Sequence, residues 1–207
     1  MSIAFRSLDM SSLDAEVVAD ASRLHTELLP RSPLAELGEG FLRRFYYGVL
    51  PSTGAIVVRV AYLDGRAAGL IAIAANPGAL RRVAKVRAFS LFSSLACSIF
   101  ASPKRIGAAL RLMRLRGFDD EAGEILSFGV LPRYRSADGA MQLPEALYAA
   151  ALEYLRASGA RLARAVVDRD NIEARLFYAA RAWRIEGEGD PAWPVSTLRV
   201  SKPLKPA

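Results

Sequence analysis

The feature that most constrains this 207-residue chain is a strand–loop–helix pattern between residues 121 and 159. A run rich in strand-forming residues, 125–131, is ended by Pro132. A polar loop follows, and then an amphipathic helix with Gly159 at its end. Because unpaired N–H groups and the helix dipole attract anions at a helix start, this pattern predicts an anion site in the loop.

Two motifs lie on this stretch and just beyond it. The first combines Val130, Pro132 and Arg135 with a small residue at Ala140, and it carries Asp138 in the loop. The second reads Asn-x-x-Ala-x-x-Phe-Tyr and consists of Asn171, Ala174, Phe177 and Tyr178. In this order the two motifs resemble the GNAT superfamily of acetyl-CoA-dependent N-acetyltransferases, although that family has glycine where this chain has Asp138.

The resemblance covers residues 13–187, apart from an unusual insert at 79–118. It implies an α/β fold with a mixed, mostly antiparallel sheet of six or seven strands, helices on both faces, and two helices after the first strand. We expect these helices at about 13–29 and 35–49. The whole chain, 1–207, then forms one domain, with a helical basic insert between the third and fourth strands.

Acetyl-CoA is the co-substrate that the resemblance implies, and its phosphates would bind Arg135 and the backbone of the loop that follows. That loop consists of Ser136, Ala137, Asp138, Gly139 and Ala140. Asp138 adds a negative charge there, and the segment from Arg135 to Gly159 is longer than in the family. Pro144 suits the first turn of a helix that begins near Leu143. We therefore expect a reshaped phosphate loop.

The strand before this loop would hold the pantetheine arm. Gly129, inside an apolar run, indicates either a bulge or a close backbone approach. In the family this strand splays from its neighbour and its main chain binds pantetheine, a role that falls here to Phe128 and Val130. One N–H there would stabilise the oxyanion. Asn171 suits a helix cap, and the resemblance implies that it also helps to position CoA.

Amide formation also needs a base for the acceptor ammonium and an acid for the departing thiolate. Glu124 stands 11 residues before Arg135, an offset at which some family members carry their catalytic glutamate. Regular alternation would put Glu124, Leu126 and Phe128 on one face of the strand. Tyr178 matches the family tyrosine that protonates the thiolate. Structural roles remain open for these residues, as a strand-edge carboxylate for Glu124, a core side chain for Tyr178 and a surface charge for Arg135.

Other polar residues carry weaker signals. The chain has one histidine, His25, and one cysteine, Cys97, which excludes a zinc site built from several of these residues and a disulfide within the chain. We therefore expect no metal. His25 is more often structural than catalytic in such a position, and Tyr46 and Tyr47 are interpreted as core residues that could also line the acceptor pocket.

The insert holds all of the excess charge. Residues 79–118 contain nine Lys or Arg and no Asp or Glu, in a chain whose net charge is +7. The segment includes fourteen uncharged residues, 88–101, and a helical pattern at 106–118. Either it forms two helices over the sheet with a solvated basic face, or it is a basic, apolar flap for an anionic partner: a membrane surface, a phosphorylated acceptor or the CoA phosphates. Nucleic acid is less favoured, because aromatic and basic residues do not alternate.

The leading hypothesis is an N-acetyltransferase that moves acetyl from acetyl-CoA to a primary amine by direct attack in a ternary complex. The alternatives are a catalytically impaired GNAT-like binding module and a peripheral acyltransferase, either of which would use the basic insert to bind an anionic partner or a membrane surface. The acceptor, a small molecule or a peptide, is left open, as is the oligomeric state, with a homodimer among the options. No apolar run reaches the ~18–20 residues of a membrane span, and the first ten residues lack signal-peptide features, so we expect a cytoplasmic protein.

Overall fold

The computed structural model describes residues 2–114, 122–135, 142–189 and 195–204. Its centre is a seven-stranded sheet in the order β1-β2-β3-β4-β5-β7-β6. Only the β4–β5 pair is parallel in this sheet, and the other neighbouring pairs are antiparallel. The strands are β1 (Ile3–Leu8), β2 (Val57–Leu63), β3 (Arg66–Ala74), β4 (Ala122–Val130), β5 (Leu162–Asp168), β6 (Arg184–Glu188) and β7 (Thr197–Pro203). The predicted α/β class and mixed sheet are confirmed.

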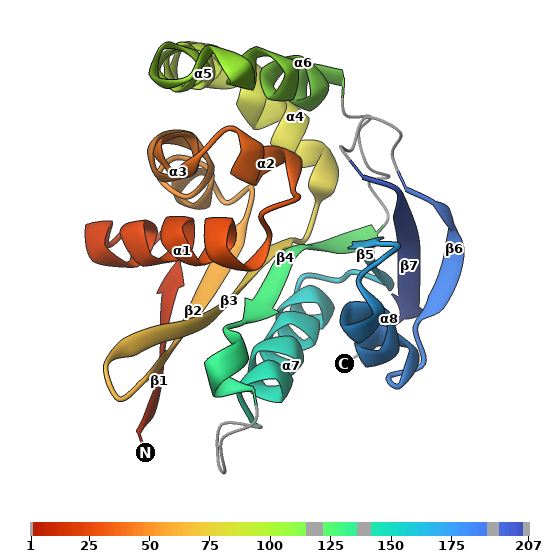
Figure 1. Cartoon of the computed structure of the whole chain (residues 1–207). Helices are drawn as coiled ribbons and strands as arrows, with labels where there is room; N and C mark the ends of the chain where they lie inside the picture. Colours follow the sequence, from red (N-terminus) through yellow and green to blue (C-terminus); the bar gives the residue numbers. More distant parts are fainter. Residues whose placement is uncertain (1, 115–121, 136–141, 190–194, 205–207) are drawn as a thin grey trace.

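Helices cover both faces of the sheet (Figure 1). One face carries α1 (Ala15–Leu28), α2 (Pro33–Glu36), α3 (Glu39–Phe41), the π-helical turn η1 (Leu42–Tyr46) and the insert; the other carries α7 (Gln142–Ala157) and α8 (Ile172–Ala179). Short 3₁₀ turns lie in the connections between these elements: η2 (Pro51–Thr53), η3 (Pro103–Arg105) and η4 (Pro132–Tyr134). Each face therefore has its own apolar core, one under α1 and η1 and one under α7.

The second helix expected at 35–49 is broken into shorter pieces. Gly38 adopts a positive φ of 84°, a conformation that only glycine adopts without strain, and it ends α2. The guanidinium of Arg105 lies so close to Gly38 that an added Cβ would stand 2.5 Å from its Nη2 atom. This close approach lets the insert pack against the break, which the helical periodicity of the sequence did not indicate.

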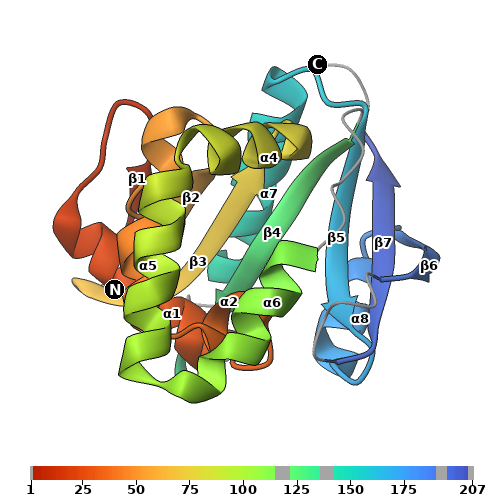
Figure 2. The same cartoon turned by 90° about the horizontal axis from the view of Figure 1, so that it is seen from above.

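The insert forms three helices rather than the two expected. They are α4 (Pro77–Val86), α5 (Ala88–Ala101) and α6 (Ile106–Arg114), and they lie between β3 and β4 as predicted. Asn76 caps α4 by accepting a hydrogen bond from the N–H of Ala79. Helix α5 packs on α3 and η1, and α6 packs on α2. The insert is thus an outer layer above the helices that cover the first sheet face (Figures 1 and 2).

Candidate active site

A cavity of about 960 Å³ lies where β4 and β5 separate. The two strands pair only from Ala122 to Ile125 of β4, against Leu162 to Ala165 of β5, and then diverge (Figure 2). The cavity is bounded by the α1–α2 loop, by the inner sides of the insert helices, by β4 and β5, and by the start of α8. This cavity contains the candidate functional residues that the structure describes.

The main chain of β4 supplies polar groups to this gap. The N–H of Leu131 donates to the carbonyl of Ala68, so Leu131 faces β3. Successive residues of a strand point their backbone groups to alternate sides, and therefore those of Phe128 and Val130 face away from β3, toward the gap. This is the orientation that a pantetheine arm requires if it is to pair with the strand.

A bulge at Leu126 changes which side chains share a face. Ala72 of β3 pairs with Ser127 while Ile73 pairs with Ile125, so Leu126 is the extra residue. Leu126 packs in the core under α1, whereas Phe128 packs on the ring of Phe177 at 5.2 Å on the other face. The expected face with Glu124, Leu126 and Phe128 together is therefore wrong, because the bulge interrupts the alternation.

Gly129 lies in regular register opposite Leu70 rather than in a bulge. A Cβ at Gly129 would stand 3.2 Å from Cδ1 of Leu28, at the end of α1. The group that lies close to this glycine is thus the side chain of Leu28, and among the described residues neither a bulge nor another backbone segment is found there.

Glu124 lies deep in the cavity wall, with only 3% of its surface exposed. Burial raises the pKa of its carboxyl to about 8, against the opposing effect of Arg164 and Arg199. Its Oε2 atom has no hydrogen-bond partner within the described part of the chain. An orphaned buried oxygen with a raised pKa is typical of a group that exchanges protons with something bound in the cavity.

Tyr178 and Asn171 line the same cavity from α8. Burial raises the pKa of Tyr178 well above its usual value, so its phenol stays protonated at neutral pH. Its ring packs on Trp183 at 4.7 Å. Asn171 caps α8 by accepting a hydrogen bond from the N–H of Ala174 at 3.0 Å. Asn171 thus caps α8 and also lines the cavity.

Arg135 also reaches the cavity. Its Nε donates to the carbonyl oxygen of Val130 at 2.7 Å, and its Nη1 forms an ion pair with Glu173 in the first turn of α8. Arg135 thus ties the end of β4 to α8. The predicted phosphate loop, Ser136, Ala137, Asp138, Gly139 and Ala140, lies outside the residues that the structure describes.

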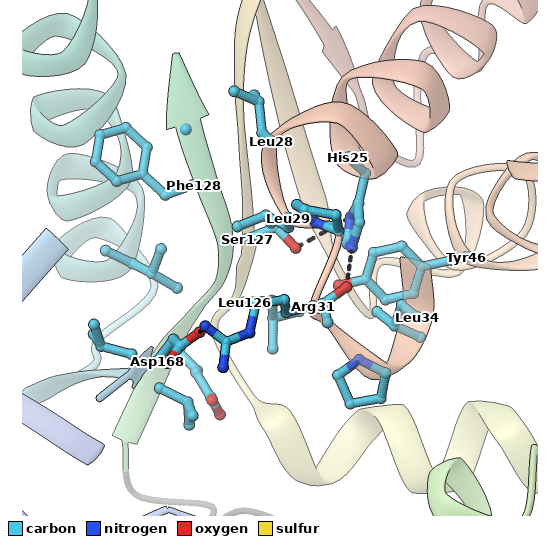
Figure 3. A pocket seen from close by; sticks show the side chains of 18 of the residues that line it. His25, Leu28, Leu29, Arg31, Leu34, Tyr46, Leu126, Ser127, Phe128 and Asp168 are labelled. Atoms are coloured by element: carbon cyan, nitrogen blue, oxygen red, sulfur yellow. Dashed lines mark hydrogen bonds and ion pairs between the residues drawn. The ribbon is translucent and has the colours of Figure 1, made fainter. Parts of the chain in front are cut away.

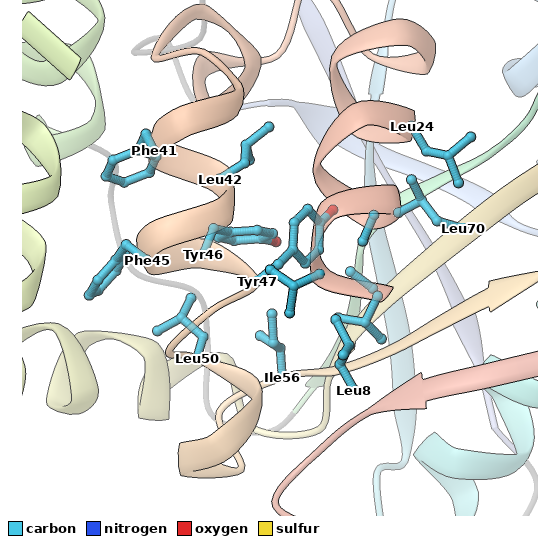
Figure 4. Close-up of a cluster of buried hydrophobic side chains, with 14 of the residues drawn as sticks. Leu8, Leu24, Phe41, Leu42, Phe45, Tyr46, Tyr47, Leu50, Ile56 and Leu70 are labelled. Atoms are coloured by element: carbon cyan, nitrogen blue, oxygen red, sulfur yellow. The ribbon is translucent and has the colours of Figure 1, made fainter. Parts of the chain in front are cut away.

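A buried polar cluster stands opposite, where α1 meets β4 (Figure 3). His25 Nδ1 lies 2.7 Å from the hydroxyl of Tyr47 and 3.4 Å from that of Ser127, and its Nε2 lies 2.9 Å from Ser32 Oγ. Burial lowers the pKa of His25 to about 3, so the ring is neutral. Tyr46 at the end of η1 and Tyr47 just after it lie between η1 and α1 (Figure 4), and their rings contact the ring of His25. His25, Tyr46 and Ser127 line the cavity.

Sequence reasoning did not single out Ser127, because only the bulge turns it toward α1. It also missed a link across the cavity. Arg31, in the α1–α2 loop, forms ion pairs with Asp168 at 3.1 Å and Asp170 at 3.4 Å, at the end of β5. These residues are far apart in the chain and carry no shared pattern. Within the described ranges, no three His, Cys, Asp or Glu residues are grouped to hold a metal ion.

The arrangement of a mixed sheet, a bulged fourth strand and a gap between two parallel strands defines the fold of the GNAT acetyltransferases. No protein-family model and no curated protein sequence matches the chain. Solved structures do match in fold. A putative GNAT-family acetyltransferase from Desulfovibrio desulfuricans is 15% identical, with a TM-score of 0.57 over 99% of this chain and 100% of that one.

Two further structures have the same fold and contain ligands. Naa50 from Arabidopsis thaliana, in complex with the bisubstrate analogue CoA-Ac-MVNAL, is 16% identical with a TM-score of 0.56 over 98% of this chain and 99% of that one. The PaiA N-acetyltransferase from Thermoplasma acidophilum, in complex with coenzyme A, is 17% identical, with a TM-score of 0.53 over 98% of this chain and 99% of that one. At these identities the likeness establishes the fold.

Proposed function

We propose that this protein transfers an acetyl group from acetyl-CoA to a primary amine by direct attack in a ternary complex. One observation carries the proposal: the gap-facing backbone of Phe128 and Val130 shares a cavity with Glu124 and Tyr178. The complexes of Naa50 and PaiA with CoA-derived ligands support the choice of donor, because both have this fold.

In the proposed reaction the pantetheine arm lies along β4 in the gap, and the thioester carbonyl accepts a hydrogen bond from a gap-facing N–H of that strand. The acceptor nitrogen attacks the carbonyl carbon, and the C–S bond breaks. Glu124 takes the proton that the amine loses, through water. Tyr178, which lines the same cavity, gives a proton to the departing thiolate.

The phosphates of CoA would bind Arg135 and the backbone of residues 136–140. Arg135 now pairs with Glu173, whose side chain is 80% exposed. An exposed ion pair is worth little, so a phosphate can replace the carboxylate of Glu173 at small cost. The planar guanidinium then offers paired donors to phosphate oxygens.

Thermal unfolding with and without acetyl-CoA tests the donor. A ligand at 100 times its Kd adds about 2.7 kcal/mol, which raises Tm by roughly 5–10 °C in a domain of this size. We expect this shift in the wild type and a smaller shift in Arg135→Ala. Arg133→Ala is the matched control, because Arg133 is half-exposed, pairs with Glu27 and lies outside the cavity wall. No shift at millimolar acetyl-CoA contradicts the proposal.

Turnover is tested by following thiol release from acetyl-CoA against a panel of small amines and peptides. Glu124→Gln should keep the thermal shift and lose thiol release, because it removes the base and leaves the backbone of β4 in place. Equal thiol release by Glu124→Gln and the wild type would exclude Glu124 as the base.

A further inference from the structure

The outer side of α5 carries three exposed phenylalanines. Phe89 is 88% exposed, Phe92 56% and Phe100 88%. Their spacing places them along one side of the helix. Ser94, Leu95 and Ser98 are buried on the opposite side, where α5 packs on α3 and η1. We call Phe89, Phe92 and Phe100 the phenylalanine stripe.

Folding does not explain the stripe, because exposed phenylalanines contribute no core contacts. Single exposed apolar residues are ordinary, whereas several large ones on the same side of a helix usually mark a contact surface. The neighbouring helices add Val86, 81% exposed, at the end of α4, and Ile106 and Leu110, each 49% exposed, on α6.

The charges around the stripe are of one sign. Arg82, Lys85, Arg87 and Lys104 are exposed and flank α5 in the sequence. None of the four forms an ion pair with any residue that the structure describes. The whole segment 79–118 contains no acidic residue. The surface is therefore apolar along α5 and positive at both ends of that helix.

We propose that α5 is the docking surface for an anionic phospholipid bilayer. The helix lies in the plane of the membrane, with the phenylalanine stripe at the acyl-chain boundary and the flanking basic side chains among the headgroups. Charge selects this partner over a second copy of the chain. A symmetric contact would pair the surface with itself and bring the same positive charges together.

The geometry of α5 fits a helix that lies on the membrane. It has 14 residues, which is about 21 Å of helix against a hydrocarbon core of about 30 Å. Among the described residues, no single helix is long and apolar enough to cross a membrane, and α4 with α5 meets the criteria of length and composition only as a pair bent by 85°.

Co-sedimentation with phosphatidylcholine vesicles, with and without phosphatidylserine, tests the proposal. We expect wild-type protein to bind the vesicles with phosphatidylserine, and added salt to weaken this binding. The triple variant Phe89→Ser, Phe92→Ser, Phe100→Ser should lose it. The control variant Ile172→Ser, Leu176→Ser, Ile185→Ser removes three exposed apolar residues elsewhere and should bind like the wild type.

A second pair of variants tests the charges. Arg82→Ser, Arg87→Ser, Lys104→Ser, all outside the cavity lining, should weaken binding by about a hundredfold, as expected for three basic groups at an anionic surface. The control Arg66→Ser, Arg161→Ser, Arg184→Ser removes the same charge from other exposed positions and should change binding far less. The variant Phe89→Trp, measured as a difference from wild-type protein because the chain already has two tryptophans, should show emission shifted to the blue on vesicles. This readout is independent of the stability of the serine variants.

Three results would overturn the proposal. The proposal would be wrong if wild-type protein stayed in solution with both kinds of vesicle, those with and those without phosphatidylserine. Equal loss of binding in the test and control variants would show a nonspecific charge effect. A dimer that the phenylalanine variant converts to a monomer, without vesicle binding by the wild type, would assign the stripe to contact between copies. The test does not depend on acetyl transfer, because binding is measured without a substrate.

Discussion

At the scale of single residues, burial in the site shifts the pKa values of two groups so that their neutral forms are favoured. Glu124 has a pKa of about 8 because burial outweighs the attraction of Arg164 and Arg199. His25 has a pKa of about 3 because it is buried without a carboxylate partner in the described structure. A carboxyl that is largely protonated at pH 7 becomes a good base only as the pH approaches 8.

The first prediction concerns the pH dependence of catalysis. In the wild type, kcat/KM should rise about tenfold per pH unit below pH 8 and level off above it, because the reactive form has Glu124 ionised. Glu124→Gln should lower kcat/KM by about 10²–10⁴-fold and remove this rise. The measurement is a profile from pH 6 to 9. The exposed variant Glu153→Gln is the control, and an unchanged rise in Glu124→Gln would reject the assignment.

The second prediction concerns Gly129. Gly129→Ala places a Cβ 3.2 Å from Leu28, which should lower the free energy of unfolding by about 1–3 kcal/mol through overpacking. Gly40→Ala, where nothing lies within 4 Å, is the matched control. Urea denaturation measures both. Leu28→Ala should reduce the cost of Gly129→Ala in a double-mutant cycle, and full additivity would mean that Leu28 is not the obstacle.

At the scale of elements, β4 combines a strand edge with a binding surface. Its apolar residues and Pro132 were sufficient to predict the strand and where it ends, whereas the strand begins at Ala122, three residues before the predicted run at 125–131. The bulge at Leu126 was not predictable, because it depends on how β4 registers against β3. A single extra residue turns Ser127 toward His25 and Phe128 toward Phe177, and local sequence carries no signal of that register.

The third prediction concerns hydrogen exchange in β4. The N–H groups of Phe128 and Val130 face the gap, so they should exchange quickly in the free protein and slowly when CoA is bound. The N–H of Leu131, bonded to Ala68, is an internal control and should be slow in both states. NMR at single-amide resolution makes the measurement. Unchanged exchange at Phe128 and Val130 with CoA bound would place the pantetheine elsewhere.

At the scale of the whole molecule, two motifs were enough to predict the fold, and long-range contacts were not predictable. Val130, Pro132 and Arg135 with the Asn171–Tyr178 motif indicated the sheet, its helices and the position of the insert. The contact of Arg31 with Asp168 joins the α1–α2 loop to the end of β5 and appears only when the chain is folded. The packing of Arg105 of the insert against Gly38 is likewise a contact between distant parts of the chain.

The fourth prediction concerns stability against pH. Between about pH 4.5 and 8 the folded protein keeps a proton on Glu124 that the unfolded chain has lost, so stability falls as pH rises. His25 acts in the opposite direction between about pH 3 and 6.5, where only the unfolded chain is protonated. From pH 6.5 to 8, of these two groups only Glu124 still changes the free energy of unfolding with pH.

The free energy of unfolding should therefore decrease by about 2 kcal/mol between pH 6.5 and 8. Urea denaturation at a series of pH values measures this slope. Glu124→Gln should flatten it, whereas Glu153→Gln, with the exposed side chain, should leave it unchanged. The same slope in Glu124→Gln would assign the effect to another group.

The only cysteine of the chain, Cys97, is exposed on α5, three residues before Phe100. The protein thus carries a natural reporter on the surface proposed to meet lipid. A water-soluble maleimide should alkylate this thiol quickly in free protein and slowly in vesicle-bound protein, with no engineered label. Membrane attachment would also shield the thiol from dissolved oxidants, so the redox state of Cys97 would indicate whether the molecule had been bound to a membrane.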